Sequence, residues 1–393
     1  MEQNTGQPIA GDRRSIDRRV IALDGFRGLM TVVVVISHFF GEVKHGISAL
    51  MMGWMAVDAF FVLSGYLIGR LIIEKQSHKN FFWTFYVRRI CRTFPIYFVC
   101  VIVVFYIEGV FHPETTYQTE TFPLWTYLAF IQNFWMSASN SIGTHWLSPT
   151  WTLAVEEQFY LVAPAMVIFT PRRYLMPVLI SLMLLAMGAR TWITVSGVAS
   201  PLSAQVMLIT NADVLVAGII GAVAIKTWHV NWQSLDQFLR VAPVVLIFAT
   251  LLLGAVTGVE STIFEMLAQT MIAVAFAMMI LSLVRGSPEA RRYENKVLCF
   301  FGNISYAVYL THLTVLGLMH NIILGTAPDI ETPAQIAVTI AALPPTVLVS
   351  WILTRLIEEP ISNYGRSFKW SEERVVRKAH SLPLPEPAEP AKS

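Results

Sequence analysis

The stretch "LDGFRGLMTVVVVISHFFGE", residues 23–42, decides the fold class of this chain. Its apolar run has the length of a helix that crosses a bilayer, for which about 20 residues are needed. It also carries two ionisable side chains, Arg27 near one end and His38 near the other. Because an ionisable residue within a membrane span is energetically costly, it is by default a candidate for function. The stretch therefore predicts a membrane helix that has a chemical role.

The composition extends this interpretation to the whole chain. Of its 393 residues, 55% are hydrophobic and only 14% are charged, whereas a soluble domain carries about 25% charged residues. The net charge of +2 gives no reason to expect a nucleic-acid partner. The three cysteines lack metal-binding or disulfide spacing, and we expect no metal. No small-residue cleavage site follows the first apolar run, so we interpret that run as a retained helix and not as a signal peptide.

Further apolar stretches are long enough to cross or nearly cross a bilayer. With the first, they predict an all-α polytopic membrane protein with about ten transmembrane helices. The predicted spans lie near residues 22–41, 53–73, 94–110, 150–169, 174–195, 204–225, 241–257, 263–284, 304–325 and 335–357. An even number of spans places both termini on the same side of the membrane.

The distribution of lysine and arginine orients these spans, because basic residues accumulate on cytoplasmic loops. With the N-terminus inside, 24 of the 28 basic residues fall on the cytoplasmic side, and Lys44 is the one basic residue in an outer loop. Both termini are therefore predicted to be cytoplasmic. Residues 122–135 are apolar but short, and counting them as a span would turn Arg172 and Arg173 outward. We predict a re-entrant or interfacial segment there, on the outer face.

The same patterns divide the chain into three parts. Residues 1–21 form a polar cytoplasmic segment, and residues 22–362 form the membrane domain. Residues 363–393 are basic and then Pro-rich ("LPLPEPAEPAK"), a composition typical of a disordered tail. No second globular domain is expected at either end.

Arg27 and His38 are eleven residues apart, which on an α-helix is about 20° from eclipsed with a rise of about 16 Å. Both side chains should therefore face the same way, one at the cytoplasmic edge and one in the outer half of the membrane. An alternative interpretation pairs Arg27 with Asp24 at the inner interface and leaves His38 as a polar residue near the outer headgroups.

Three acids are predicted at a depth similar to that of His38. Asp58 lies in the second span, and the adjacent Glu156 and Glu157 lie in the fourth, which also enters from outside. Isolated charges at this depth would be costly, so they should face one another or a wet cavity. A histidine beside a carboxylate is an arrangement for general-base catalysis. We therefore expect Glu157 or Glu156 within reach of His38.

A second cluster, Arg88, Arg89 and Arg92 in "FYVRRICRTFP", precedes the third span on the cytoplasmic side. Arginine matches phosphate oxygens in bidentate geometry, and Arg89 and Arg92 share one face if the segment is helical. The excess of basic residues on cytoplasmic loops would by itself also place arginines here. Near the end of the chain, Ser305, Tyr309 and His312 form a stripe that is typical of helix–helix contacts. No chemistry is assigned to Asp213, Glu358 or Glu359.

Six blocks of sequence, in order, resemble the membrane-bound acyltransferase 3 family of bacterial O-acyltransferases. They are "LDGFRGLMTVVVVISHF", "DAFFVLSGYLIG", "RRICRTFPIYF", "WTLAVEEQFYLVAP", "GNISYAVYLTHL" and "EEPIS", and they extend from about residue 22 to residue 362. The family pattern of an arginine and a histidine separated by ten residues in the first span is matched by Arg27 and His38. Its cytoplasmic R-x-x-R element is matched by Arg89 and Arg92.

This resemblance implies a membrane enzyme that transfers an acyl group, often acetyl, from acyl-CoA to a hydroxyl of an exported or surface carbohydrate or a glycolipid. It also implies a bacterial cytoplasmic membrane, a donor whose phosphates meet Arg89, Arg92 and Arg27, and no tightly bound cofactor. Some relatives carry an additional extracytoplasmic domain, which we do not expect in this chain. His38 would deprotonate the acceptor, either in direct transfer or through an acyl-enzyme.

Other functions stay open on the sequence. The same chemistry on a small molecule or a lipid fits the blocks equally well, since relatives acylate such acceptors. A secondary transporter would also place charges at mid-membrane, but it predicts an internal repeat that the sequence does not show. A scaffold would not need a histidine, acids and arginines in these positions.

Overall fold

The computed structural model describes residues 10–111, 121–228, 231–259 and 261–372, and it describes side chains from Ile21 onward. The described residues form helices and connecting turns, with no β-strand among them. Ten helical segments are long and apolar enough to cross a membrane. The predicted polytopic all-α fold is therefore confirmed. The ten segments are Ile21–Gly41, Ser48–Lys75, Phe81–Val110, His145–Phe169, Arg172–Ser196, Pro201–Thr227, Trp232–Thr257, Thr262–Val284, Ser305–Leu324 and Pro333–Ser367.

Five of these segments are one long helix, four combine a long helix with a short helix or turn, and the last combines four elements. The long helices are α1 (Ala10–Ile36), α2 (Gly53–Lys75), α3 (Phe81–Phe111), α6 (Trp151–Phe169), α7 (Arg172–Ser196), α9 (Leu208–Thr227), α10 (Trp232–Thr257), α11 (Thr262–Val284) and α14 (Ser305–Leu324). The last segment is α15 (Pro333–Ala341), α16 (Leu343–Leu353), the π-helical turn η4 (Thr354–Glu358) and α17 (Glu359–Ser367). Shorter elements are η1 (Ser37–Gly41), η2 (Ser48–Leu50), α4 (Leu124–Leu128), α5 (Gln132–Ser139), η3 (His145–Thr150), α8 (Pro201–Val206), α12 (Ala290–Tyr293) and α13 (Lys296–Asn303).

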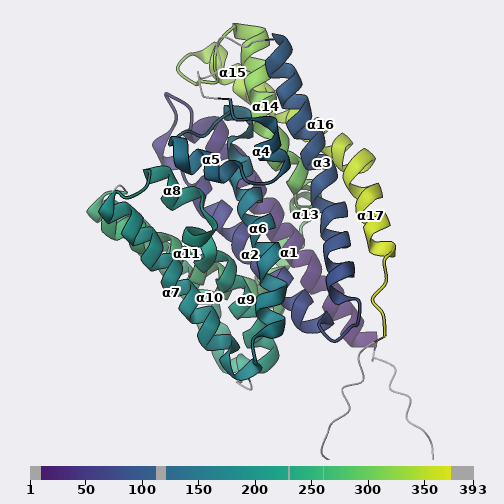
Figure 1. Ribbon diagram of the computed structural model, residues 1–393. Coiled ribbons are helices and arrows are strands. Elements are labelled where there is room, and N and C mark those ends of the chain that lie inside the picture. The colour runs from purple at the N-terminus through teal and green to yellow at the C-terminus, as the bar shows by residue number, and fades with distance from the viewer. Residues whose placement is uncertain (1–9, 112–120, 229–230, 260, 373–393) are drawn as a thin grey trace, which may run out of the picture.

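The helices α1, α2, α6 and α9 form the centre of the bundle, while α7 and α10 lie on one flank and α3 and α17 on the other (Figure 1). In the span that contains α9, 72% of the residues in its most apolar 18-residue stretch are buried inside the bundle. The corresponding share is 17% in α7 and 22% in α10. The flanking helices therefore offer apolar side chains to lipid. The first turn of α1 and the end of α17 lie at the same end of the bundle (Figure 1), as an even number of spans requires.

The central pair α2 and α9 approaches so closely that only glycine fits at the crossing. A Cβ atom at Gly65 would lie 1.9 Å from the Leu215 carbonyl oxygen, and one at Gly218 would lie 2.1 Å from the Val62 carbonyl oxygen. Small residues at such crossings allow backbone contact, which replaces the hydrophobic effect as a packing force inside a bilayer. This contact holds α2, which carries Asp58, at a fixed distance from α9.

A buried ion pair joins α7, α9 and α11. The Arg190 guanidinium donates to both Asp213 oxygens at 2.9 and 3.3 Å, and it also contacts the Thr270 hydroxyl at 3.0 Å. Both ionic side chains are almost completely buried, with exposed fractions of 4% and 0%. Charges at this depth are tolerated because each is paired and hydrogen-bonded.

Two boundaries differ from those predicted. The helix α3 begins at Phe81 and not near residue 94, so the arginine cluster lies on the helix and not in a loop. The predicted short segment at residues 122–135 corresponds to α4 and to α5, which continues to Ser139, and neither helix is long enough to cross a bilayer.

The carboxyl-terminal part of the domain is longer than predicted. The helix α17 continues to Ser367, past the expected start of the tail at residue 363. The chain then packs on the start of α3, where the Trp370 ring stacks on Phe81 and Asn80 exchanges hydrogen bonds with Ser371 and Lys369. These aromatic and backbone contacts order residues whose composition alone gave no reason to expect it. The rest of the predicted tail, residues 373–393, and the segment before residue 10 lie outside the described residues.

Candidate active site

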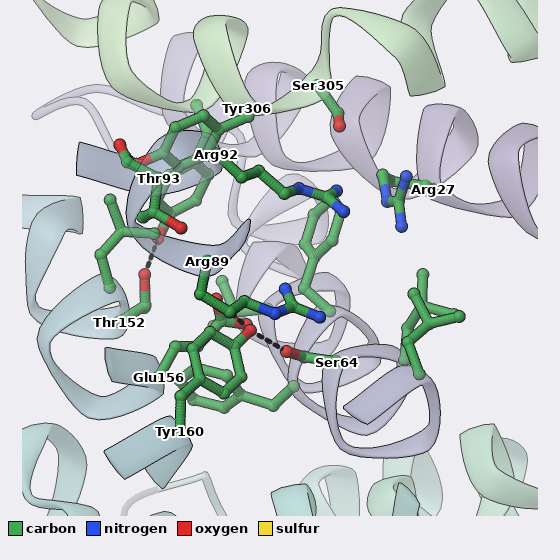
Figure 2. Close-up of a pocket in the computed structure, with 17 residues that line it drawn as sticks. Arg27, Ser64, Arg89, Arg92, Thr93, Thr152, Glu156, Tyr160, Ser305 and Tyr306 are labelled. Atoms are coloured by element: carbon green, nitrogen blue, oxygen red, sulfur yellow. Dashed lines mark hydrogen bonds between the residues drawn. The ribbon is translucent and has the colours of Figure 1, made fainter. Parts of the chain in front are cut away.

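Two adjoining cavities are lined by six of the eight predicted site residues. An inner cavity, with an empty volume of about 870 Å³, is lined by Arg27, Arg89, Arg92 and Glu156 (Figure 2). An outer cavity, with an empty volume of about 1660 Å³, is lined by His38 and Asp58. Both cavities share Val57, Thr152 and Tyr309 as lining residues.

The inner cavity gathers three arginines from two helices. Arg27 comes from α1, and Arg89 and Arg92 come from adjacent turns of α3. Figure 2 shows their guanidinium groups turned toward one space. Arg27 also makes the predicted contact with Asp24, at 3.3 Å, so the two interpretations of Arg27 are compatible. Three guanidinium groups around one cavity form a site for a multiply charged anion such as a phosphate ester.

A polar network supports Arg89 on the opposite wall of this cavity. The Arg89 guanidinium lies 4.9 Å from the centre of the Tyr160 ring, in cation–π geometry. The Tyr160 hydroxyl donates to Glu156 at 3.1 Å and shares a short hydrogen bond with Ser64. Glu157 interacts electrostatically with Arg89, and its buried Oε1 atom has no hydrogen-bond partner among the described residues. Glu156 and Glu157 therefore belong with the arginines.

Arg88, predicted together with Arg89 and Arg92, makes its contacts outside both cavities. Its guanidinium donates to the Phe368 carbonyl oxygen at 2.6 and 3.1 Å and lies 5.0 Å from the centre of the Trp370 ring. It does not line either cavity. Arg88 therefore lies apart from Arg89 and Arg92, because adjacent residues on α3 point about 100° apart and Arg88 faces Phe368 and Trp370.

His38 lies in the π-helical turn η1, which interrupts the regular helix at its outer end. A π-helical turn of this kind changes the direction of a side chain and is frequent at functional sites. The His38 ring stacks on His312 of α14 with 4.8 Å between centres, and its Nδ1 lies 2.6 Å from Nε2 of His312. The other nitrogen, Nε2, lies 3.4 Å from the Glu42 carboxylate.

The hydrogen bonds assign the tautomers of this pair. Nδ1 of His312 lies 3.0 Å from the Val308 carbonyl oxygen, which can only accept, so Nδ1 carries the proton. Nε2 of His312 is then an acceptor, and Nδ1 of His38 must donate to it. This leaves the lone pair of His38 on Nε2, the nitrogen beside Glu42. The outer cavity thus presents a proton acceptor, Nε2 of His38, with the Glu42 carboxylate beside the same nitrogen.

Glu42 is held in place by the turn that carries His38. The Ser37 hydroxyl donates to Glu42 Oε1 at 2.9 Å and accepts from the Gly53 backbone N–H at 3.0 Å. Burial raises the pKa of the Glu42 carboxyl above its ordinary value, while the Ser37 hydrogen bond and the nearby His145 lower it in part. A raised carboxyl pKa lies closer to that of an imidazole. Moving a proton between the two groups therefore changes the free energy less than it would for a carboxyl with an ordinary pKa.

The predicted partners of His38 are therefore replaced by others. Glu156 and Glu157 lie beside Arg89, and Glu42 and His312 take the place predicted for them. His312 belongs to the stripe that the sequence analysis assigned to helix contacts. Its seven-residue spacing from Ser305 marks a face, but only the packing of α14 on η1 shows that this face meets His38. Glu42 and His145 lie next to loops, at the end of η1 and the start of η3, so no hydrophobic periodicity in the sequence marks them as site residues.

The two cavities meet at a polar contact between α6 and α14. The Tyr309 hydroxyl lies 2.8 Å from the Thr152 hydroxyl and donates to the Pro149 carbonyl oxygen at 3.0 Å. Because both side chains line both cavities, this contact is the partition between them.

One set of side chains among the described residues has the spacing of a cation site. Atoms of His45, Asp329 and Glu331 lie within 4.8 Å of one another. Nδ1 of His45 contacts Asp329 directly at 2.7 Å, and the Asp329 carboxylate also accepts from the His45 and Ile330 backbone N–H groups. These contacts satisfy the cluster as a tie between two loops at the rim of the outer cavity, so we assign it no metal.

The fold and the two cavities define a multi-pass membrane protein with one cavity lined by arginines and another lined by histidines and carboxylates. Residues 20–355 match the family model of an acyltransferase domain, and the chain belongs to that family.

Two curated relatives extend the comparison. The chain is 25% identical over 374 residues to the peptidoglycan O-acetyltransferase OatA of Listeria monocytogenes, a match that covers 89% of this chain and 58% of the relative. It is 30% identical over 166 residues to the O-acetyltransferase OatA of Staphylococcus aureus, which covers 40% of this chain and 26% of the relative. The chain thus spans less than two thirds of the length of these relatives. No solved structure matches it.

Proposed function

We propose that this protein is a bacterial membrane O-acetyltransferase that moves an acetyl group from acyl-CoA in the inner cavity to a carbohydrate hydroxyl in the outer cavity. The observation that carries the proposal is the juxtaposition of an arginine-lined cavity and a histidine–carboxylate cavity across the Tyr309–Thr152 partition. Family membership and the names of the two relatives support the reaction class and a surface carbohydrate, such as peptidoglycan, as the acceptor.

The donor side follows from charge. Coenzyme A carries several phosphate charges, which Arg27, Arg89 and Arg92 would bind at the cytoplasmic end. Its thioester sits at the end of a long, uncharged arm that would reach toward the partition. Glu156 would hold Tyr160 in place against Arg89 through their hydrogen bond. The donor is then anchored by its charged end, while its reactive end faces the outer cavity.

The chemical step uses the free nitrogen of His38. The acceptor hydroxyl oxygen attacks the thioester carbonyl carbon, and Nε2 of His38 takes the hydroxyl proton. The carbon–sulfur bond then breaks, the ester forms, and the coenzyme A thiolate leaves and takes the proton from Nε2 of His38, which is neutral again. Glu42 and His312 stabilise the imidazolium between these events, one at each ring nitrogen.

The experiment is mass spectrometry of surface carbohydrates from cells with and without the gene, combined with transfer from labelled acetyl-CoA by the purified protein in lipid nanodiscs. We expect O-acetyl groups that depend on the gene and labelled acetyl on a carbohydrate hydroxyl. Label found only on a lipid or a small molecule would contradict the carbohydrate acceptor and favour the alternative acylation. No label on any acceptor would contradict the enzyme.

A further inference from the structure

A second set of polar side chains lines the outer cavity, apart from His38 and Glu42. Asp58 comes from α2, Asn211 from α9 and Gln269 from α11. Two half-buried tryptophans, Trp54 and Trp151, line the same cavity. The mechanism proposed above makes no use of these five residues.

Asp58 is the most unusual of them. Its side chain is 95% buried, with an exposed fraction of 5%, yet it forms no ion pair among the described residues. It lies near the Gln269 side chain, which lines the same cavity, while its Oδ2 atom has no hydrogen-bond partner among the described residues. A buried carboxylate oxygen without a partner is costly, and each such atom in a native protein requires an explanation. A bound ligand that donates a hydrogen bond to Oδ2 would provide this explanation.

The groups around Asp58 are held rigidly by a second layer. Gln269 donates to Asn211 Oδ1 at 2.7 Å. Asn211 in turn donates to the Gln205 and Met207 carbonyl oxygens at 2.7 and 2.8 Å, which fixes the junction of α8 and α9. Asp213, on the same helix as Asn211, is paired with Arg190 of α7, which also bonds to Thr270 of α11. Such a supported arrangement is preorganised for binding, because little freedom is lost when a ligand arrives.

The lining also selects the chemistry of the ligand. No lysine or arginine lines the described part of the outer cavity, whereas Glu42 and Asp58 do. An anionic ligand would be repelled there, while a neutral ligand with many hydroxyl groups could donate to carboxylate and amide oxygens. Indole rings offer flat apolar surfaces with a polar edge, suited to the C–H faces of a sugar ring. The lining therefore fits a neutral saccharide.

We propose that Asp58, Gln269 and the two tryptophans form the subsite that binds and orients the acceptor saccharide, so that one of its hydroxyl groups reaches Nε2 of His38. The inference rests on the proposed function, which it deepens by naming the residues that hold the acceptor. Asp58 is a binding residue in this assignment, and not a partner of His38.

The test uses the full-length protein in lipid nanodiscs and chitotetraose, a neutral saccharide, as the probe. Binding of chitotetraose and of acetyl-CoA is measured separately by calorimetry for wild type, Asp58→Asn and Gln269→Leu. We expect both variants to bind chitotetraose at least tenfold more weakly than wild type, with unchanged affinity for acetyl-CoA. Unchanged acetyl-CoA affinity also shows that each variant is folded. Asp236→Asn, an exposed residue of α10 paired with Arg240, is the matched control and should bind both ligands like wild type.

The outcomes separate this inference from the proposed function. Equal chitotetraose affinity in wild type and both variants would overturn the subsite, as would the absence of saturable binding by wild type. Binding by wild type that is lost in the variants supports the subsite even if no acetyl group is transferred, and in that case the proposed function alone fails. Where transfer is measurable, the KM for the saccharide should rise in both variants while the KM for acetyl-CoA stays constant.

Discussion

At the scale of single residues, the hydrogen bonds of His312 determine what His38 can do. The Val308 carbonyl oxygen fixes the proton of His312 on Nδ1, and this in turn leaves the lone pair of His38 on Nε2. A backbone atom on α14 thus sets the protonation of a side chain on η1. His312 is a positioning residue in this arrangement, because it acts through His38.

Replacement of Glu42 by glutamine should lower kcat by tenfold or more and leave acetyl-CoA affinity unchanged. The amide keeps the shape of the side chain but cannot stabilise the imidazolium of His38, which lies 3.4 Å away. Because burial raises the pKa of the Glu42 carboxyl above its ordinary value, the wild-type rate should fall as the pH drops through that raised pKa and Glu42 gains a proton. The measurement is kcat against pH for both proteins. An unaltered kcat in the variant would show that Glu42 takes no part in the proton transfer.

The arginines allow a matched comparison on one helix. Arg89→Ala and Arg92→Ala should each weaken acyl-CoA binding by about 1.5 to 3 kcal/mol, the range for hydrogen bonds to charged groups. Lysine at either position should restore only part of the lost acyl-CoA affinity, because lysine lacks the planar guanidinium group that forms two parallel hydrogen bonds. Arg88→Ala is the control, since Arg88 contacts Phe368 and Trp370 and does not line the cavity. Equal affinity in all three alanine variants, measured on folded protein, would contradict the assignment of the inner cavity to the donor.

At the scale of elements, hydropathy was sufficient to predict the ten spans, because each is a run of about 20 apolar residues. The arrangement of the site residues was harder to predict from the sequence. The turn η1 is π-helical, and no periodic pattern in "ISHFFGE" indicates this. The pairing of His38 with His312 joins residues 274 positions apart, so it depends on how α14 packs. The same reason explains why Glu156 and Glu157 were predicted beside His38. Glu156 lies in the inner cavity with the arginines, and His38 lies in the outer cavity, because hydropathy determines neither the exact depth of a side chain nor the direction in which it points.

The contact between α6 and α14 leads to a prediction about coupling. Tyr309→Phe removes the hydroxyl that bonds to Thr152 and Pro149 but keeps the ring. We expect the partition to loosen, so that water reaches the thioester and acetyl-CoA hydrolysis without acceptor rises severalfold relative to transfer. Thiol release measured with and without acceptor gives the ratio. A ratio equal to that of wild type would show that this contact does not separate the cavities.

At the scale of the whole molecule, the account depends on orientation. The first turn of α1, the end of α17 and the inner cavity must face the cytoplasm, where coenzyme A is found. In a variant without Cys91, Cys100 and Cys299, a cysteine introduced at Arg173 should be labelled only after the membrane is opened. One introduced at Glu331, which is 61% exposed, should be labelled from outside in intact cells. Labelling of position 173 in intact cells would contradict the ten-span orientation.

The role of His38 is tested most directly by comparing wild type, His38→Ala and His38→Gln at matched concentrations of folded protein. Loss of a general base costs about 10²- to 10⁴-fold in rate. Glutamine keeps polarity and a hydrogen bond to His312 but cannot take a proton. Acetyl transfer should therefore be lost in both variants, while acetyl-CoA binding, measured in parallel, is retained. Substantial turnover by His38→Gln would contradict the assignment of His38 as the base.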